Sequence, residues 1–248
     1  MPNLFVMAGP NGAGKSTTAR LILTGERSVT EFVNADVIAA EQGLSEIAAG
    51  RAMLHRLDEL TALRADIAFE TTLSSASLRG RIAAMRDAGY VFTLVYVWIQ
   101  SADMSVQRVA ARVAAGGHSI PEHVIRRRYP RSLYNFFNAY IPIADAWVML
   151  DNTARGRTET IASRDIGASI QIAKPALWSQ LMKQYSKPSD SVREERLLAA
   201  PRFTMQDIAA AADKAAREAV ARHKALGQAI VIWRDGKVVT LKPEEIEA

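Results

Sequence analysis

The chain has 248 residues, of which 49% are hydrophobic and 23% charged, so it has enough apolar side chains for one sizeable core. It contains no cysteine, which excludes disulfide bonds, thiolate catalysis and Cys-ligated zinc. No apolar run reaches the roughly 18 residues of a membrane-spanning helix and no basic leader precedes the first apolar run, so we expect a cytoplasmic protein outside the membrane.

The first part of the chain alternates short apolar runs with helical stretches. We expect buried strands at residues 4–8, 32–34, 67–69, 90–99 and 147–150, and helices at 15–23, 45–64 and 77–88, the last capped by Gly89. Strands separated by helices of this length indicate a parallel sheet covered on both faces. The predicted fold class is therefore α/β, with residues 1–155 as its core.

The pattern changes after residue 155, and we expect residues 156–248 to form a C-terminal extension packed on the core. Residues 158–173 fit a strand pair, and residues 187–202 fit a polar loop. An Ala-rich helix is expected at 204–226, with Thr204 as its N-cap, Asp207 in its first turn and Gly227 just beyond its end. Strands at 230–233 and 238–241 flank Asp235-Gly236, which favours a hairpin with a type I′ turn.

The first turn carries the motif G-x-x-x-x-G-K-[ST], matched at every fixed position by Gly9, Pro10, Asn11, Gly12, Ala13, Gly14, Lys15 and Ser16, with Thr17 following. A chain of this length matches by accident on the order of 1% of the time. In such a loop the backbone N–H groups face phosphates, the lysine reaches the β- and γ-phosphates, and the hydroxyl of Ser16 ligates Mg²⁺. The motif alone predicts a P-loop NTPase that binds a nucleoside triphosphate with magnesium, and ATPases, GTPases and kinases share it. The rest of the sequence favours ATP and a nucleotide-kinase-like fold.

Two other sequence features decide which kind of P-loop protein this is. An Asn-Lys-x-Asp guanine signature is lacking, and the strand at 67–69 ends in Glu70-Thr71-Thr72 where motor ATPases carry paired acidic residues. This pattern favours a small-molecule kinase. Glu70 is expected to organise magnesium-bound water or the acceptor, and Thr72 to hydrogen-bond the acceptor; a purely structural turn is the alternative.

Asp36 is the candidate catalytic base, because it follows the strand at 32–34 and so lies at the mouth of the sheet, where open α/β folds bind ligands. A carboxylate there can accept the proton of an attacking hydroxyl. Asn34 is expected beside it in the acceptor site. The alternative for Asp36 is a helix N-cap.

Arginines gather between residues 108 and 131, at positions 108, 112, 126, 127, 128 and 131. Gly116-Gly117 between them suits a hinge, and Pro121 can start the next helix. Arg108 and Arg112 are one turn apart on one helical face. Phosphoryl transfer needs positive charge on the equatorial oxygens, which favours a lid that carries catalytic arginines from this cluster. A solvated basic helix face is the alternative. His118 is either a lid contact or structural.

These motifs together resemble the zeta-toxin family of P-loop kinases. The resemblance rests on the loop from Gly9 to Ser16, on Asn34-Ala35-Asp36, on Glu70-Thr71-Thr72, and on Arg112 followed by Gly116-Gly117-His118 and residues 125–129. It implies ATP-dependent phosphorylation of a sugar hydroxyl on UDP-N-acetylglucosamine or a related nucleotide-sugar, and a small helical antitoxin as partner. It also implies that Lys15 and Ser16 bind ATP and magnesium, that Asp36 is the base, and that Glu70 and Thr72 face the acceptor. The catalytic lid arginines it implies are Arg112 and one of the run Arg126-Arg127-Arg128, with Arg126 and Arg128 as candidates.

Two other functions remain open. The net charge of +5 suits a nucleoside or nucleic-acid-end kinase, although only 7% of residues are aromatic, which leaves few stacking platforms for nucleic acid. The other is a nucleotide-dependent regulator that binds ATP and has no acceptor.

Overall fold

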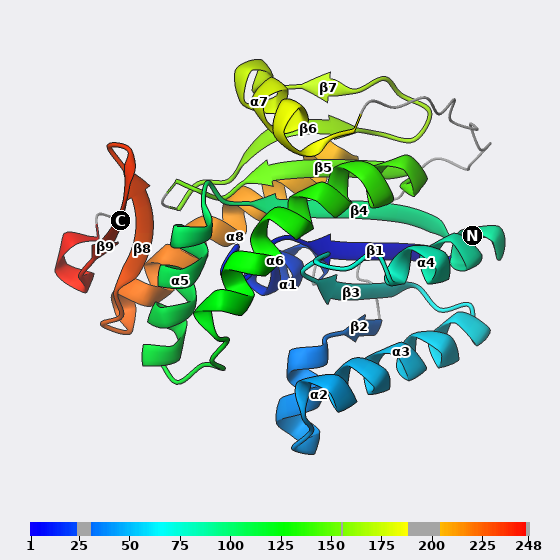
Figure 1. The fold of residues 1–248 in the computed structure, drawn as a ribbon, viewed down its shortest axis with the longest axis horizontal. Coiled ribbons are helices and arrows are strands. Elements are labelled where there is room, and N and C mark those ends of the chain that lie inside the picture. Colours follow the sequence, from blue (N-terminus) through cyan, green and yellow to red (C-terminus); the bar gives the residue numbers. More distant parts are fainter. Residues whose placement is uncertain (24–30, 155, 188–203, 247–248) are drawn as a thin grey trace.

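A seven-stranded sheet lies at the centre of the computed structural model, which describes residues 1–23, 31–154, 156–187 and 204–246. The strand order is β2-β3-β1-β4-β5-β6-β7 (Figure 1). The bounds are β1 (Asn3–Ala8), β2 (Glu31–Val33), β3 (Ile67–Thr71), β4 (Val91–Trp98), β5 (Ala146–Asp151), β6 (Glu159–Arg164) and β7 (Gln171–Ile172). From β2 to β5 neighbouring strands are parallel, and β6 and β7 add to the sheet antiparallel.

Helices cover both faces of the sheet, as the alternation of strands and helices predicts. One face carries α3 (Glu46–Ala62), α4 (Leu78–Asp87), α6 (Glu122–Asn135) and α7 (Pro175–Tyr185), and the other carries α1 (Lys15–Leu23) and α8 (Met205–Ala225). Successive side chains of β1 point to opposite faces: Leu4 and Val6 pack with the first group, Phe5 and Met7 with the second. Burial on both faces explains why these strands read as continuous apolar runs.

Several element ends match the predicted caps. Thr204 caps α8 and forms a capping box with Asp207. Asp235 and Gly236 both adopt positive φ, 50° and 78°, between β8 (Ile230–Arg234) and β9 (Lys237–Leu241). Two positive φ angles in sequence are what a type I′ hairpin turn requires, so the predicted C-terminal helix and hairpin are confirmed.

The structure also contains elements that the sequence pattern did not predict. A short helix, α2 (Ala35–Gln42), precedes α3, and α7 follows β7. By contrast, α5 (Ala102–Ala114) is the helix expected to carry Arg108 and Arg112. After α6 come a π-helical turn, Phe136–Tyr140, and a 3₁₀ turn, Ile141–Ile143, and a further 3₁₀ turn, Pro243–Glu245, follows β9. The π turn lies in the core, where Phe136 stacks edge-on against Trp147, so tertiary packing stabilises this unusual geometry.

The region after residue 155 is built partly into the main sheet. The strand pair expected at 158–173 is present as β6 and β7, and β6 pairs with β5. The polar loop expected at 187–202 lies outside the described residues except for its first residue, and the division of the chain at residue 155 stays a prediction.

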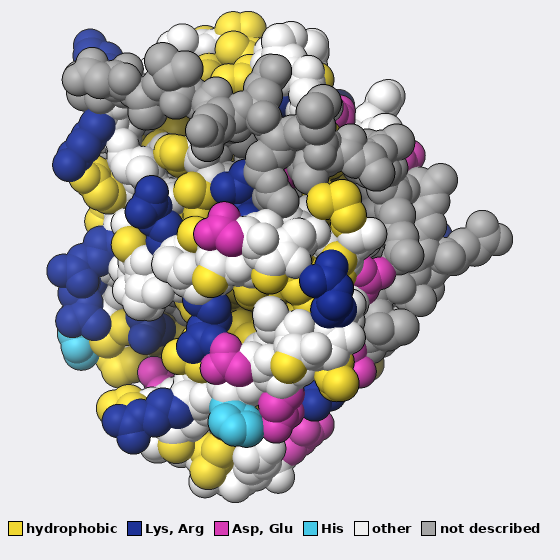
Figure 2. Space-filling model, turned by 90° about the vertical axis from the view of Figure 1, so that its right-hand side faces the viewer, with side chains coloured by type: hydrophobic (Ala, Val, Ile, Leu, Met, Phe, Trp, Pro, Cys, Tyr) yellow, Lys and Arg dark blue, Asp and Glu magenta, His cyan; other side chains and the backbone are white. Residues whose placement is uncertain are grey.

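The carboxyl ends of the parallel strands open toward α5 and the β8–β9 hairpin, which stand together at one end of the molecule (Figure 1). Figure 2 shows the opposite end, where basic and acidic side chains are interspersed with apolar and neutral atoms. None of the helices in the described parts of the chain combines the length and apolar character needed to span a bilayer.

Candidate functional site

The loop between β1 and α1 can form only with glycine at key positions. Gly9 has φ = 141°, and a Cβ there would lie 2.1 Å from the carbonyl oxygen of Val97. Gly14 has φ = 91°, and its Cβ would lie 2.6 Å from Nδ2 of Asn152. The same Nδ2 donates a hydrogen bond of 2.8 Å to the carbonyl oxygen of Ala13. The loop therefore packs tightly against the ends of β4 and β5 and is held in one shape.

Lys15 is buried at the start of α1 and points back over the loop. Its Nζ donates a hydrogen bond of 3.0 Å to the carbonyl oxygen of Pro10 and lies 3.8 Å from Oε1 of Glu70. Burial lowers the pKa of Lys15, while the charges of Glu70 and Asp36 partly offset that effect. This amine is thus a desolvated cation at the loop, with two carboxylates near it.

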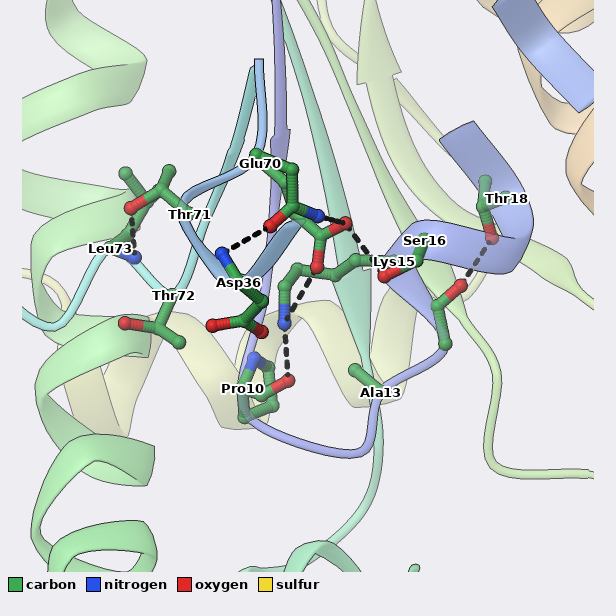
Figure 3. A network of polar contacts seen from close by, with 12 residues as sticks. Pro10, Ala13, Lys15, Ser16, Thr18, Asp36, Glu70, Thr71, Thr72 and Leu73 are labelled. Atoms are coloured by element: carbon green, nitrogen blue, oxygen red, sulfur yellow. Dashed lines mark hydrogen bonds and ion pairs between the residues drawn. The ribbon is translucent and has the colours of Figure 1, made fainter. Parts of the chain in front are cut away.

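Glu70, at the end of β3, connects the loop to β2. Its Oε2 accepts a hydrogen bond of 2.7 Å from the hydroxyl of Ser16 and one of 3.1 Å from Nδ2 of Asn34. Its side chain is 10% exposed. Figure 3 shows these groups converging beside Lys15. Glu70 therefore belongs to the loop side of the site through Ser16 and Lys15.

Asp36 lies in the first turn of α2, but it is not the N-cap of that helix. Asn34 caps the helix, because its Oδ1 accepts a hydrogen bond of 2.8 Å from the backbone N–H of Asp36. The carboxylate of Asp36 is left exposed and lies near Lys15, as Figure 3 shows. The alternative role of Asp36, as helix N-cap, therefore belongs to Asn34 instead.

Thr72 follows β3 in a turn with unusual backbone geometry. Its hydroxyl shares a hydrogen bond of 3.0 Å with the hydroxyl of Ser74. Between them Leu73 is buried with φ = 51°, and its carbonyl oxygen accepts a hydrogen bond of 2.7 Å from Nδ2 of Asn135. A bulky residue at positive φ is held there only by its surroundings, so this turn is fixed in place by the end of α6.

The arginines of the expected lid divide into two groups. Arg112 and Arg128 lie close enough to Lys15 for their charges to lower its pKa further. Arg126 instead pairs with Asp103 and Glu122, at 2.6 and 2.7 Å, on an exposed surface. The structure therefore brings Arg112 and Arg128 to the loop and leaves Arg126 away from it.

Glu46, at the start of α3, contacts the lid region at two points. Its Oε2 lies 3.7 Å from Nη2 of Arg128, and its Oε1 lies 3.4 Å from Nε2 of His118. Arg112 in turn donates a hydrogen bond of 3.0 Å to the carbonyl oxygen of His118. Glu46 gave no signal in the sequence, because its partners are more than 70 residues away along the chain.

The donor atoms near the loop suit a hard cation that is held mainly by other ligands. The hydroxyl of Ser16 and the carboxylate of Glu70 are adjacent oxygen donors, which Mg²⁺ prefers. The described part of the chain has no cluster of three or more His, Asp or Glu side chains that would form a dedicated metal cage. Such a pair fits Mg²⁺ that takes its remaining ligands from phosphate and water.

A family model described as an AAA domain matches residues 4–130, which are 127 of the 248 residues. The chain belongs to this AAA domain family. A protein of Haemophilus influenzae described as uncharacterized is 29% identical over 126 residues, which are 49% of this chain and 88% of that protein. The family match covers the loop, Asp36, Glu70 and the lid region up to Pro130.

Solved structures share the fold of this AAA domain. The crystal structure of AvrRxo1-ORF1:-ORF2 with ATP aligns with a TM-score of 0.57 and 17% identity, over 77% of this chain and 66% of that one, so the chain spans just under two thirds of its length. The PezAT chromosomal toxin-antitoxin system of Streptococcus pneumoniae aligns with a TM-score of 0.52 and 14% identity, over 77% of this chain and 80% of that one. The fold is thus that of a P-loop kinase-like domain.

A cavity of about 540 Å³ begins at the loop and extends to the C-terminal part of the chain. Its loop side is lined by Gly12, Gly14, Lys15, Ser16, Thr17 and Glu70, and its far side by α5, α8 and β8. Asn11 lies beside it in the loop, with a buried Oδ1 that lacks a hydrogen-bond partner among the described residues. The sequence pattern did not predict that the C-terminal elements line this cavity. The run of alanines on α8 could have indicated it, because small side chains leave room between packed elements.

Proposed function

We propose that the protein is an ATP-dependent kinase that transfers the γ-phosphate to a hydroxyl group of a small molecule. The observation that carries this proposal is the meeting of Lys15, Ser16, Glu70 and Asp36 at the carboxyl ends of three neighbouring strands. Open α/β sheets bind ligands at this edge. The four side chains supply a cation, two groups for a metal and a free carboxylate, which are the parts that phosphoryl transfer requires.

The loop from Gly9 to Ser16, with Thr17, holds the phosphates in this proposal. Its backbone N–H groups and the start of α1 provide partial positive charge, and Lys15 reaches the β- and γ-phosphates. Ser16 and Glu70 hold Mg²⁺, which supplies charge neutralisation between the phosphates when it is bound. The ion pair of Lys15 with Glu70 keeps the amine over the loop before nucleotide arrives.

The acceptor lies on the Asp36 side of the loop. Asp36 accepts the proton of the attacking hydroxyl, while Asn34 fixes the backbone of Asp36 through the helix cap. Thr72 sits on the rigid turn after β3 and hydrogen-bonds the acceptor. Arg112 and Arg128 stabilise the negative charge that spreads over the transferred phosphoryl group.

A nucleotide-sugar such as UDP-N-acetylglucosamine is the proposed acceptor, on the resemblance of the Asn34–Asp36 and Glu70–Thr72 segments to zeta toxins. The same resemblance proposes a small helical antitoxin as partner and the cytoplasm as location. The structural neighbours are compatible with this partner, since one is the PezAT toxin-antitoxin system and the other is AvrRxo1-ORF1:-ORF2.

The test is incubation of the purified protein with ATP, Mg²⁺ and UDP-N-acetylglucosamine, followed by mass spectrometry. The expected product is one phosphate heavier and is absent with Lys15→Ala and with Asp36→Asn. The matched control is Glu41→Gln, an exposed acidic residue on the same helix as Asp36, which should form product at the wild-type rate. ATP binding by calorimetry should survive Asp36→Asn, because Asp36 acts on the acceptor and its helix cap uses only the backbone N–H.

The other outcomes separate the remaining functions. Transfer to oligonucleotide ends, with affinity that falls steeply as salt rises, would replace the nucleotide-sugar by nucleic acid. ATP binding without transfer to any acceptor in a metabolite screen, unchanged by Asp36→Asn, would make the protein a nucleotide-dependent regulator. Growth arrest of a bacterial host by the wild type but not by Asp36→Asn would support the toxin and its antitoxin partner.

A further inference from the structure

Two of the elements on the far side of the cavity, α8 and β8, lie in the C-terminal part of the chain, outside the residues that the family match covers. Helix α8 contributes Ala216, Ala219, Val220 and His223, and β8 with the residues before it contributes residues 228–232. The matched segment ends at residue 130. This wall is therefore a property of this chain that the family match does not dictate.

The wall is fixed to the phosphate-binding side by Arg108 of α5. Its Nε donates a hydrogen bond of 3.2 Å to the carbonyl oxygen of Val231, and its Nη2 lies 3.4 Å from the carbonyl oxygen of Thr153. Burial lowers the pKa of Arg108 to about 10, so the guanidinium stays charged at neutral pH. The hairpin also packs through Ile230 and Ile232 with Val220 of α8. The hairpin is thus held against the cavity from two sides.

The chemistry of this wall suits a nucleoside. Alanine and valine side chains from α8 line the cavity, and Ile230, Val231 and Ile232 of β8 lie beside them, so the side chains of this wall are largely apolar. Strand β8 pairs with β9 along one edge. At its other edge, Arg108 donates a hydrogen bond to the carbonyl oxygen of Val231. Because alternate residues of a strand present N–H and C=O to the same edge, Ala229 and Val231 offer backbone groups on the Arg108 side.

His223 adds a polar group at the same place. Its Nδ1 is buried and has no hydrogen-bond partner among the described residues, and the side chain lines the cavity. Burial and then the charge of Arg222 lower the pKa of His223, so the ring is neutral at pH 7 and can donate or accept one hydrogen bond. A buried polar atom without a partner is rare unless a ligand or water completes it.

We propose that α8 and β8 bind the nucleobase and ribose of the nucleotide whose phosphates lie on the loop. The base lies on the apolar wall of α8 and β8, and its polar edge meets His223 and the free edge of β8. The C-terminal hairpin is then part of the nucleotide site and sets base preference. The inference rests on the proposed nucleotide binding, and its test is designed to separate the two.

The test compares two Mg²⁺-bound ligands by calorimetry, ATP and inorganic tripolyphosphate, which has the phosphates and no nucleoside. The wild type should bind ATP at least about tenfold more tightly than tripolyphosphate, a difference of about 1.4 kcal/mol. Ala219→Trp fills the cavity, so it should weaken ATP at least about tenfold and leave tripolyphosphate within about twofold. The control, Ala221→Trp, changes an exposed residue on the same helix and should alter neither affinity.

A second measurement needs no variant and so does not depend on whether Ala219→Trp folds. Hydrogen exchange of the wild type should show that ATP protects the backbone amides of residues 228–232 and that tripolyphosphate does not. Equal affinity of the two ligands, unchanged ATP affinity in Ala219→Trp, or equal protection by both ligands would overturn the inference and leave the loop's role intact. If the wild type bound neither ligand, the proposed function itself would fail.

Discussion

The carboxylate of Glu70 accepts a hydrogen bond of 2.7 Å from the hydroxyl of Ser16, a residue 54 positions earlier in the chain. The contact forms because β3 pairs with β1, which places the end of β3 directly beside the start of α1. It ties the two metal-ligand candidates together and holds Glu70 within reach of Lys15.

Glu70→Gln should weaken the site through charge while it keeps the shape. The amide can still accept from Ser16, but it no longer neutralises Lys15 or attracts a cation. We expect the apparent affinity for Mg²⁺ in the transfer reaction to fall about 10- to 100-fold, measured as the metal concentration that gives half-maximal rate. Glu59→Gln, an exposed residue of α3, is the control and should leave that concentration unchanged. An unchanged metal requirement in Glu70→Gln would remove Glu70 from the metal site.

Arg112→Ala and Arg128→Ala should each lower kcat at least about 100-fold, because each removes positive charge near the transferred group. Arg126→Ala is the internal control: its side chain pairs with Asp103 and Glu122 on the surface, so kcat should stay within about twofold, as for an exposed ion pair. The measurement is single-turnover transfer at saturating ATP. The reverse ranking of Arg126 and Arg128 would contradict this arrangement of the lid.

Lys15→Met should stabilise the protein in the absence of nucleotide. Burial holds the pKa of Lys15 below its ordinary value of 10.5, so the protonated amine destabilises the folded state at every pH below the lowered pKa. That penalty fades as pH rises from the lowered pKa toward 10.5, where the unfolded chain also loses its proton. We expect a higher Tm for Lys15→Met at pH 7, by about 2–4 °C for each kcal/mol gained.

The pH dependence of Tm for Lys15→Met tests whether burial of Lys15 does destabilise the folded state. The Tm difference between Lys15→Met and the wild type should shrink as the pH is raised toward 10, and the variant should gain no stability from added ATP and Mg²⁺. A lower Tm for Lys15→Met at pH 7 would mean that the ion pair with Glu70 outweighs burial. Differential scanning calorimetry across the pH series measures both effects.

Asp145→Ala should destabilise the fold by about 3–5 kcal/mol, the usual effect of breaking a buried ion pair. The carboxylate of Asp145 is 3% exposed and accepts hydrogen bonds from Arg86 at 2.8 Å and from the backbone N–H of Phe92 at 2.9 Å. Its removal leaves the Arg86 charge without this partner. The measurement is urea unfolding, and the double variant Arg86→Met with Asp145→Ala should recover part of the loss.

The parts of the site that follow from local sequence could be predicted without a structure. The loop from Gly9 to Ser16 is contiguous, and Asn34 and Asp36 lie two residues apart at the end of one strand. For Glu70 the sequence alone predicts a contact with either the magnesium or the acceptor. It does not decide between them, because the contact of Glu70 with Ser16 depends on which strands are neighbours. Strand order is a property of the whole sheet, and the sequence pattern does not contain it.

The lid arginines show a second limit of prediction from sequence. Arg126 and Arg128 are two residues apart on one helix, so they point in different directions. The buried side of α6 carries Ile125 and Tyr129, and the hydroxyl of Tyr129 donates to the carbonyl oxygen of Ile99 at 2.6 Å. That anchor fixes the rotation of the helix and turns Arg128, but not Arg126, toward Lys15. The run Arg126-Arg127-Arg128 does not by itself indicate which arginine faces the loop. That depends on how α6 packs against the rest of the protein.

The cavity wall at residues 228–232 has a consequence for synthesis on the ribosome. The loop and the first strands leave the exit tunnel early, yet the side of the cavity that faces them is encoded near the other end of the chain. A nascent chain that has emerged only as far as β7 contains all seven strands of the main sheet, but it lacks the surface proposed to hold a nucleoside. Tight nucleotide binding would thus begin only after translation has passed the hairpin, although the loop that holds the phosphates is made much earlier.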